Sequence, residues 1–214
     1  NSRGIHVLGA NQDALLWRMK VHDFAGIIFS QEGNRHLSVM DSHLTRPIDM
    51  GSGGNIGFVG SRGLAWMGNH CQDSTLGEHV LRVFFAQGMV VDHNFLADAA
   101  PSKETLKFHS RTDPSMTLWS EHVVISNNYL RADANVWNVL IGPAGPVVGN
   151  DWQNIRDVIV EGNTQKQYLE NALMFYNPTL PPSQQYSLAS LGTQLGVWDE
   201  PLAAADLPNV LLVD

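Results

Sequence analysis

Arg82, Lys107 and His109 are the side chains whose types and spacing best suit chemistry on an acidic substrate. Arg82 and Lys107 each stand at the centre of a triplet with apolar ends, and His109 follows two residues after Lys107. Guanidinium and ammonium groups bind carboxylates, arginine in a bidentate manner. An imidazole, or a lysine beside another cation, can accept a proton. We therefore predict β-elimination on a uronate, with Arg82 binding the carboxylate, Lys107 as base or second carboxylate ligand, and His109 as acid or base.

These three side chains meet only if strands that are distant in the sequence lie side by side. The supporting pattern is a series of short segments whose first and third residues are apolar: Ile5-His6-Val7, Ile27-Ile28-Phe29, Ile56-Gly57-Phe58, Leu81-Arg82-Val83, Leu106-Lys107-Phe108 and Val139-Leu140-Ile141. Alternation with a period of two predicts strands with one buried face and one variable face.

A second series of segments alternates with the first along the chain. Its members are Val21-His22-Asp23, Val39-Met40-Asp41, Met67-Gly68-Asn69, Val91-Asp92-His93, Ile125-Ser126-Asn127 and Val160-Glu161-Gly162. Several end in turn formers, as in His93-Asn94, Asn127-Asn128 and Gly162-Asn163. Asn and Gly tolerate the left-handed conformation of a sharp corner, and stacked Asn side chains can form a hydrogen-bonded ladder.

The two series predict an all-β fold, a right-handed parallel β-helix solenoid of about six to eight coils. Each coil of about 22 to 25 residues would hold two or three strands. No helical pattern separates the strands, and the tight hairpins of a β-sandwich or propeller are missing. We place the β-helix at residues 1–176, with insertions at 110–120 and 143–154, and a C-terminal loop or capping segment at 177–214.

This alignment predicts two outward columns of side chains on the first strand series. The middle residues form the column His6, Ile28, Gly57, Arg82, Lys107 and Leu140. The next outward column is Leu8, Ser30, Val59, Phe84, His109 and Gly142. Neighbouring strands lie about 4.8 Å apart, so Arg82, Lys107 and His109 would form one basic patch. Neither column contains Asp or Glu, and a glycoside hydrolase needs two carboxylates, so hydrolysis on this face is disfavoured.

Further candidates for substrate binding lie on the same face or beside the insertions. They are His6, Trp119, Trp137, Asn138 and Trp152. Tryptophan rings can stack on sugar rings and line a groove, while an asparagine amide can bond sugar hydroxyls. The alternative for the three tryptophans is that they anchor the inserted loops to the solenoid.

Composition excludes several classes of protein. A net charge of −8 disfavours a sequence-independent nucleic-acid binder. Cys71 is the single cysteine, so neither an internal disulfide nor a Cys-based metal site is expected. No apolar run has the length of a membrane span. His22, His43, His70 and His93 stand at different offsets from their apolar anchors, so we predict no metal site.

Three segments resemble coils of the pectate-lyase-like β-helix superfamily. They are Glu78-His79-Val80-Leu81-Arg82-Val83, His122-Val123-Val124-Ile125-Ser126-Asn127-Asn128 and Asn154-Ile155-Arg156-Asp157-Val158-Ile159-Val160-Glu161-Gly162-Asn163. The resemblance covers roughly residues 4–165 and implies an extracellular or periplasmic protein that acts on a polysaccharide. Members of this superfamily are mostly lyases, hydrolases or epimerases, and we expect lyase chemistry first. Such lyases use an outward Lys or Arg, often with calcium, but this sequence shows no clear calcium site and we expect no cofactor.

A function of another class also fits this resemblance. The chain would then be a non-catalytic tailspike- or adhesin-like glycan-binding domain, or a spacer within a longer protein. The sequence begins Asn1-Ser2-Arg3 without an initiator Met, which agrees with a mature form or a fragment of a longer chain.

Overall fold

The computed structural model describes residues 4–8, 13–30, 34–48, 54–101, 103–110, 120–132, 138–143, 155–166, 173–175, 186–187 and 210–213. Within these ranges the protein consists of β-strands with no helix, and all but one of the strand pairings are parallel. The all-β prediction and its parallel pairing are therefore confirmed. Correspondingly, no helix in the described ranges is long and apolar enough to cross a membrane.

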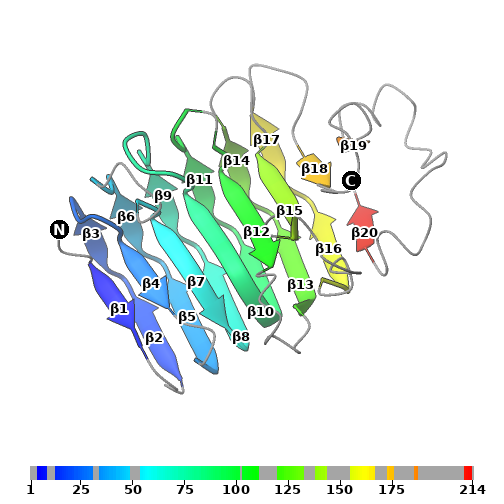
Figure 1. The fold of residues 1–214 in the computed structure, drawn as a ribbon, viewed down its shortest axis with the longest axis horizontal. Coiled ribbons are helices and arrows are strands. Elements are labelled where there is room, and N and C mark those ends of the chain that lie inside the picture. Colours follow the sequence, from blue (N-terminus) through cyan, green and yellow to red (C-terminus); the bar gives the residue numbers. More distant parts are fainter. Residues whose placement is uncertain are drawn as a thin grey trace.

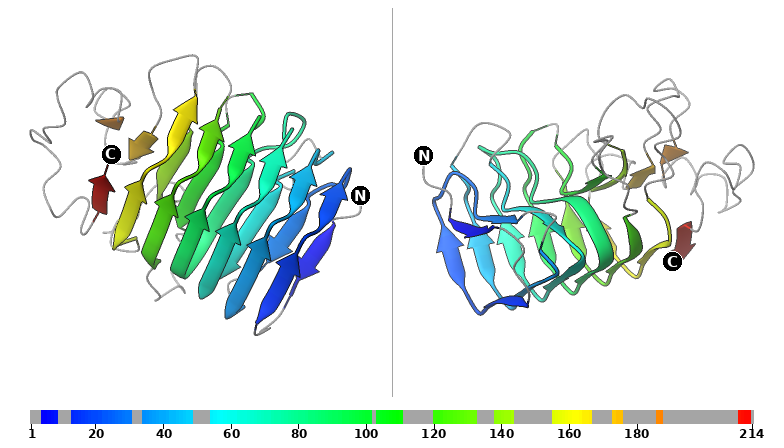
Figure 2. Two further views of the ribbon diagram at one scale, coloured as in Figure 1. Left: turned by 180° about the vertical axis from the view of Figure 1, so that it is seen from behind. Right: turned by 60° about the horizontal axis from the view of Figure 1, so that its bottom comes forward.

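The strands form three columns, and each strand pairs with its counterparts in the same column (Figures 1 and 2). The first column contains β1 (Ile5–Val7), β4 (Ile28–Ser30), β7 (Gly57–Ser61), β10 (Leu81–Asp92), β12 (Leu106–Ser110), β15 (Val139–Pro143) and β18 (Leu173–Phe175). The second contains β2 (Ala14–Trp17), β5 (His36–Met40), β8 (Gly63–Met67), the end of β10, β13 (Glu121–Ser126), β16 (Val158–Glu161) and β20 (Val210–Val213).

The third column was not recognised as a series in the sequence. It contains β3 (Lys20–His22), β6 (His43–Thr45), β9 (His70–Gln72), β11 (Phe95–Ala97), β14 (Tyr129–Arg131) and β17 (Thr164–Lys166). The triplet at Val21 belongs to this column, not to the second, because Val21 pairs with Leu44. The side chains that face inward in all three columns form one apolar core.

The register of the first column agrees with the sequence alignment at one end and differs from it at the other. Leu81 pairs with Leu106 and Arg82 with Lys107, as predicted. Ile5, however, pairs with Ile28, and Ile28 with Gly57, one residue later than predicted. The outward column is therefore His6, Phe29, Phe58, Arg82, Lys107 and Leu140. The predicted outward residues Ser30 and Val59 are fully buried.

The register shift has a physical cause at Gly57. A Cβ added to Gly57 would lie 2.7 Å from Leu81 Cδ1 and 2.8 Å from Trp66 Cη2. The indole of Trp66 is fully buried and fills the interior next to this position. Gly57 is thus an inward residue whose missing side chain makes room for a tryptophan. The flanking Ile56 is also buried, so polarity alone did not show which residue lies in register with Leu81.

We expect Gly57→Ala to lower the free energy of unfolding by about 1–3 kcal/mol, because it overfills this part of the core. Combining Gly57→Ala with Trp66→Phe is expected to recover part of the loss, since phenylalanine removes the outer ring atoms. Urea unfolding of the two single variants and the double variant measures this coupling. Strictly additive losses would show that Gly57 and Trp66 do not share the space.

The corner between the second and third columns is built as the sequence predicts. Asp41, Gly68, His93, Asn127 and Gly162 occupy this corner with φ between 49° and 65°. The residues that follow include a ladder of asparagines in which each side chain bonds the next, namely Asn69, Asn94, Asn128 and Asn163. The first three of these side chains are buried, so the ladder is part of the interior.

Two further features lie toward the two ends of the chain. In the predicted C-terminal segment, β20 pairs in parallel with β16, and β19 (Tyr186–Ser187) pairs antiparallel with β18. Trp17, the last residue of β2, is 52% exposed on the outer face of that strand. Its indole NH donates a hydrogen bond to Asp41.

Candidate functional site

Arg82 and Lys107 lie side by side on the outer face of the first column, as the sequence predicts. They are direct partners across the parallel pair of β10 and β12. The alternation of the strands turns Leu81 and Val83 inward and leaves the two cations half-buried at the surface. The strand register therefore holds two positive charges one strand spacing apart, the arrangement required to bind a carboxylate from two sides.

Two glutamates complete this group and were missed as site residues. Glu78 Oε2 lies 3.3 Å from Arg82 Nη1, and Glu104 Oε2 lies 3.4 Å from Lys107 Nζ. Lys103 Nζ approaches Glu78 Oε1 at 4.0 Å. We call these five residues the charged cluster. With three cations and two anions, it carries a net charge of +1.

The two glutamates belong to the turns that lead into β10 and β12, so they were outside the outward columns considered in the sequence. Their signal is an acidic residue that precedes each cation, by four residues at Glu78 and by three at Glu104. The outward columns themselves contain no carboxylate, as predicted, but two carboxylates lie beside the cations of the first column. Both glutamates are shielded from water, with side chains 15% and 9% exposed.

A buried histidine lies beneath the charged cluster. His79 Nδ1 lies 2.9 Å from the main-chain oxygen of Glu104 and 3.3 Å from its carboxylate. Burial, followed by the nearby positive charges of Lys107 and Arg82, lowers the pKa of His79 to about 3, although the hydrogen bond with the Glu104 main chain acts to raise it. His79 is accordingly neutral at pH 7 and donates from Nδ1 to the Glu104 carbonyl. This hydrogen bond fixes the turn that carries Glu104.

Aromatic side chains extend the outer face from the charged cluster toward the first coil. The ring centroids of Phe58 and Phe29 are 5.6 Å apart, and those of Phe29 and His6 are 5.3 Å apart. The Arg82 guanidinium lies 5.0 Å from the Phe58 ring centroid, and Phe84 packs against Phe58 at 4.9 Å. The one-residue register shift brings Phe29 and Phe58 to this face. The column is therefore an aromatic row that ends in two cations.

The remaining predicted site residues differ in their position and exposure. His6 is exposed at the end of the aromatic row, where it could contact a ligand. Asn138 is fully buried before β15, which counts against any contact with sugar hydroxyls. His109 lies on β12 opposite Gly142, but its side chain is outside the described part of the protein. Trp119, Trp137 and Trp152, with most of both insertions, are also outside the described residues.

The four histidines considered for a metal site do not converge. His43 and His70 are neighbours in the third column, with ring centroids 4.8 Å apart. Burial, followed by the nearby His70, lowers the pKa of His43. His22 and His93 instead contact the aspartates next to them in the sequence. Among the described residues, a different group brings three metal-binding atoms within 4.8 Å of one another, namely Glu121, His122 and Asp157.

The charged cluster and the aromatic row together form a surface suited to an anionic ligand with flat apolar faces. Comparison with family models, curated proteins and solved structures found no match to this chain.

Proposed function

We propose that this chain is a right-handed parallel β-helix that binds an acidic polysaccharide on the outer face of its first column. Three observations support the solenoid: parallel pairing within three columns, repeated left-handed corners and a continuous asparagine ladder. A backbone that visits the three columns in turn adds one strand to each with every coil. The resemblance of three segments to the pectate-lyase-like superfamily points to the same fold.

The observation that carries the binding proposal is the pairing of Arg82 with Lys107 at the end of the aromatic row. Sugar rings stack on aromatic faces, and uronate carboxylates bind guanidinium and ammonium groups. Strand spacing repeats along the column, so successive sugar units can meet successive side chains. A chain of linked uronates therefore matches this face in shape and in charge.

Cleavage by β-elimination is the second candidate function, and the closeness of the two cations favours it. Arg82 would neutralise the uronate carboxylate, and Lys107 or His109 would remove the proton from the adjacent carbon. The electrons of that C–H bond form a carbon–carbon double bond, and the glycosidic oxygen leaves with a proton. The ion pairs with Glu78 and Glu104 oppose this step, because they keep both cations engaged. Binding is therefore the leading proposal.

Titration calorimetry of the full chain with polygalacturonate, alginate and hyaluronan tests the binding proposal, with dextran as a neutral polymer. We expect at least one acidic polymer to bind and dextran not to bind. Arg82→Gln and Lys107→Gln are each expected to weaken binding about tenfold or more, because each removes a charge-assisted contact.

Lys20→Gln is the matched control, since Lys20 is an outward cation on the third column. It is expected to bind as the wild type does. Equal weakening by all three variants would indicate attraction by net charge alone and would contradict a site at Arg82 and Lys107. Absorbance at about 235 nm during the same incubations reports the double bond formed by elimination.

A further inference from the structure

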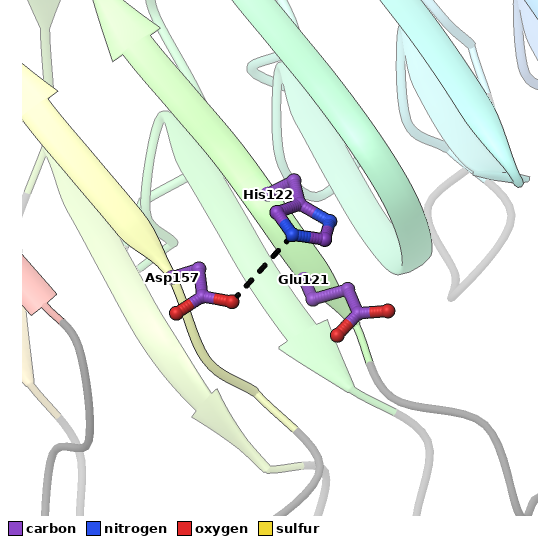
Figure 3. A group of neighbouring side chains, drawn as sticks. All are labelled: Glu121, His122 and Asp157. Atoms are coloured by element: carbon purple, nitrogen blue, oxygen red, sulfur yellow. Dashed lines mark ion pairs between the residues drawn. The ribbon is translucent and has the colours of Figure 1, made fainter.

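A second group of side chains that can bind a ligand lies at the N-terminal ends of β13 and β16, two strands of the second column. Glu121 and His122 begin β13, and Asp157 directly precedes β16, the next strand of that column. Figure 3 shows the three side chains projecting from these two neighbouring strands, with the imidazole facing the Asp157 carboxylate. One nitrogen or oxygen atom of each residue lies within 4.8 Å of the others.

The distance between His122 and Asp157 is unusual for a direct contact. His122 Nε2 lies 3.7 Å from Asp157 Oδ2, which is too long for a hydrogen bond. His36 provides an internal comparison, because Leu37 and Val123, the residues after the two histidines, occupy the same position of the second column. His36 Nδ1 lies 2.7 Å from Asp13 Oδ1, a normal hydrogen bond. The His122 pair is therefore more open than the equivalent pair at His36.

Such a separation suits two ligands of one metal ion. Two donor atoms bound about 2.0–2.1 Å from a tetrahedral ion lie about 3.4 Å apart. The ring of His122 has no hydrogen-bond partner among the described residues, and its side chain is 69% exposed. The imidazole is therefore accessible to an incoming ion, and its ion pair is with Asp157, a proposed ligand of the same ion.

Arg156 orients the third ligand without occupying all of it. Its Nε and Nη2 atoms lie 2.6 and 2.5 Å from the same oxygen of Glu121, Oε2. The Glu121 carboxylate still offers a ligand atom within 4.8 Å of those of His122 and Asp157. Arg156 Nε is also 3.9 Å from Asp157 Oδ2, so one guanidinium supports both carboxylates. Glu121, Asp157 and Arg156 together carry a net charge of −1, which a divalent cation converts to +1.

We propose that Glu121, His122 and Asp157 bind a divalent metal ion of the Zn²⁺ class, which joins β13 to β16. One imidazole and two carboxylates are suitable zinc ligands and leave the fourth position for water. Calcium fits less well, because it requires six to eight oxygen ligands. His36 lacks the third ligand, since Arg35 precedes it where Glu121 precedes His122. The stacked coils thus contain a site with three ligands and a comparable pair without the third.

Calorimetric titration of the EDTA-treated full chain with ZnCl₂ and with CaCl₂ tests this proposal. We expect saturable Zn²⁺ binding that is about tenfold or more weaker in His122→Asn and in Asp157→Asn. Both residues adopt positive φ, and asparagine tolerates that conformation, so the variants should retain the fold. Circular dichroism before each titration confirms this, and Zn²⁺ should raise the melting temperature of the wild type but not that of these two variants.

His36→Asn is the matched control and should bind Zn²⁺ as the wild type does. Zn²⁺ binding that is unchanged in His122→Asn would place the ion at other histidines and overturn the proposal. So would the absence of saturable Zn²⁺ binding, or Ca²⁺ binding of equal or greater strength that depends on Asp157 and not on His122.

Discussion

Replacing Asn94 with alanine is expected to lower the free energy of unfolding by about 3 kcal/mol, one of the two largest effects we predict. The Asn94 amide donates to the main-chain oxygen of Trp66 at 2.7 Å and to Asn128 Oδ1 at 2.9 Å. Its own oxygen accepts a hydrogen bond from Asn69 at 3.1 Å. Alanine would leave these buried groups without partners, and an unsatisfied buried polar group costs about 1–3 kcal/mol.

Asn163→Ala is the control for the ladder, because Asn163 is its last described member and is half-exposed. Water can replace some of the hydrogen bonds that its side chain makes, so we expect the free energy of unfolding to fall by only about 1 kcal/mol. Urea unfolding followed by circular dichroism measures both variants. Equal losses, or a loss below about 1 kcal/mol for Asn94→Ala, would mean that the ladder does not hold the coils together.

The second large effect is acid destabilisation through His79. The folded protein keeps this imidazole neutral, with its pKa lowered to about 3 mainly by burial, whereas the unfolded chain protonates near the ordinary histidine pKa of 6.5. Between these values the unfolded state binds more protons, so the contribution is complete above pH 6.5 and is lost as the pH falls toward 3. The loss amounts to about 1.4 kcal/mol per pH unit.

His79→Asn isolates this contribution, because asparagine can donate to the Glu104 carbonyl but does not titrate. Between pH 7.5 and 4.5 the free energy of unfolding of the wild type should fall by about 3 kcal/mol more than that of the variant. His6→Asn, at an exposed histidine, should keep the wild-type pH dependence. Parallel curves for the wild type and His79→Asn would show that the pKa of His79 is the same in the folded and unfolded states, which would contradict the prediction.

The sequence predicted the positions of Arg82 and Lys107 because each is flanked by apolar residues and is polar itself. Such triplets fix the register without ambiguity. In the segments Ile27-Ile28-Phe29 and Ile56-Gly57-Phe58, no polar residue marks the position that faces outward. The predicted register was therefore wrong by one residue in these segments. The correct register depends on Gly57 and Trp66 sharing interior space. That is a contact between residues nine apart in the sequence, and alternation alone does not show it.

The third column and the two glutamates were missed for related reasons. The strands of the third column are only three residues long in the described structure, which is too short to show a pattern of alternating polarity. Their outward positions hold aromatic and histidine side chains, including His70 and Phe95, which stack at 4.5 Å.

Glu78 and Glu104 lie in turns before the strands, and turn residues have no fixed direction in a period-two pattern. Their contacts with Arg82 and Lys107 follow from the backbone that leads into each strand.

A ligand at the proposed site must compete with the ion pairs that Arg82 and Lys107 already form. Arg82 and Lys107 already have carboxylate partners, so a uronate must displace or share Glu78 and Glu104. This competition favours a ligand that presents several carboxylates along the column over a single sugar acid. Polymers should therefore bind more tightly, per uronate, than monomers do.

A crystal structure of the full chain with a short oligogalacturonate or oligoalginate, whichever parent polymer binds, tests the central claim most directly. The proposal predicts a sugar ring against Phe58 and a uronate carboxylate within hydrogen-bonding distance of Arg82 and Lys107. An oligosaccharide seated on the second or third column, with these two cations still bonded only to their glutamates, would contradict it.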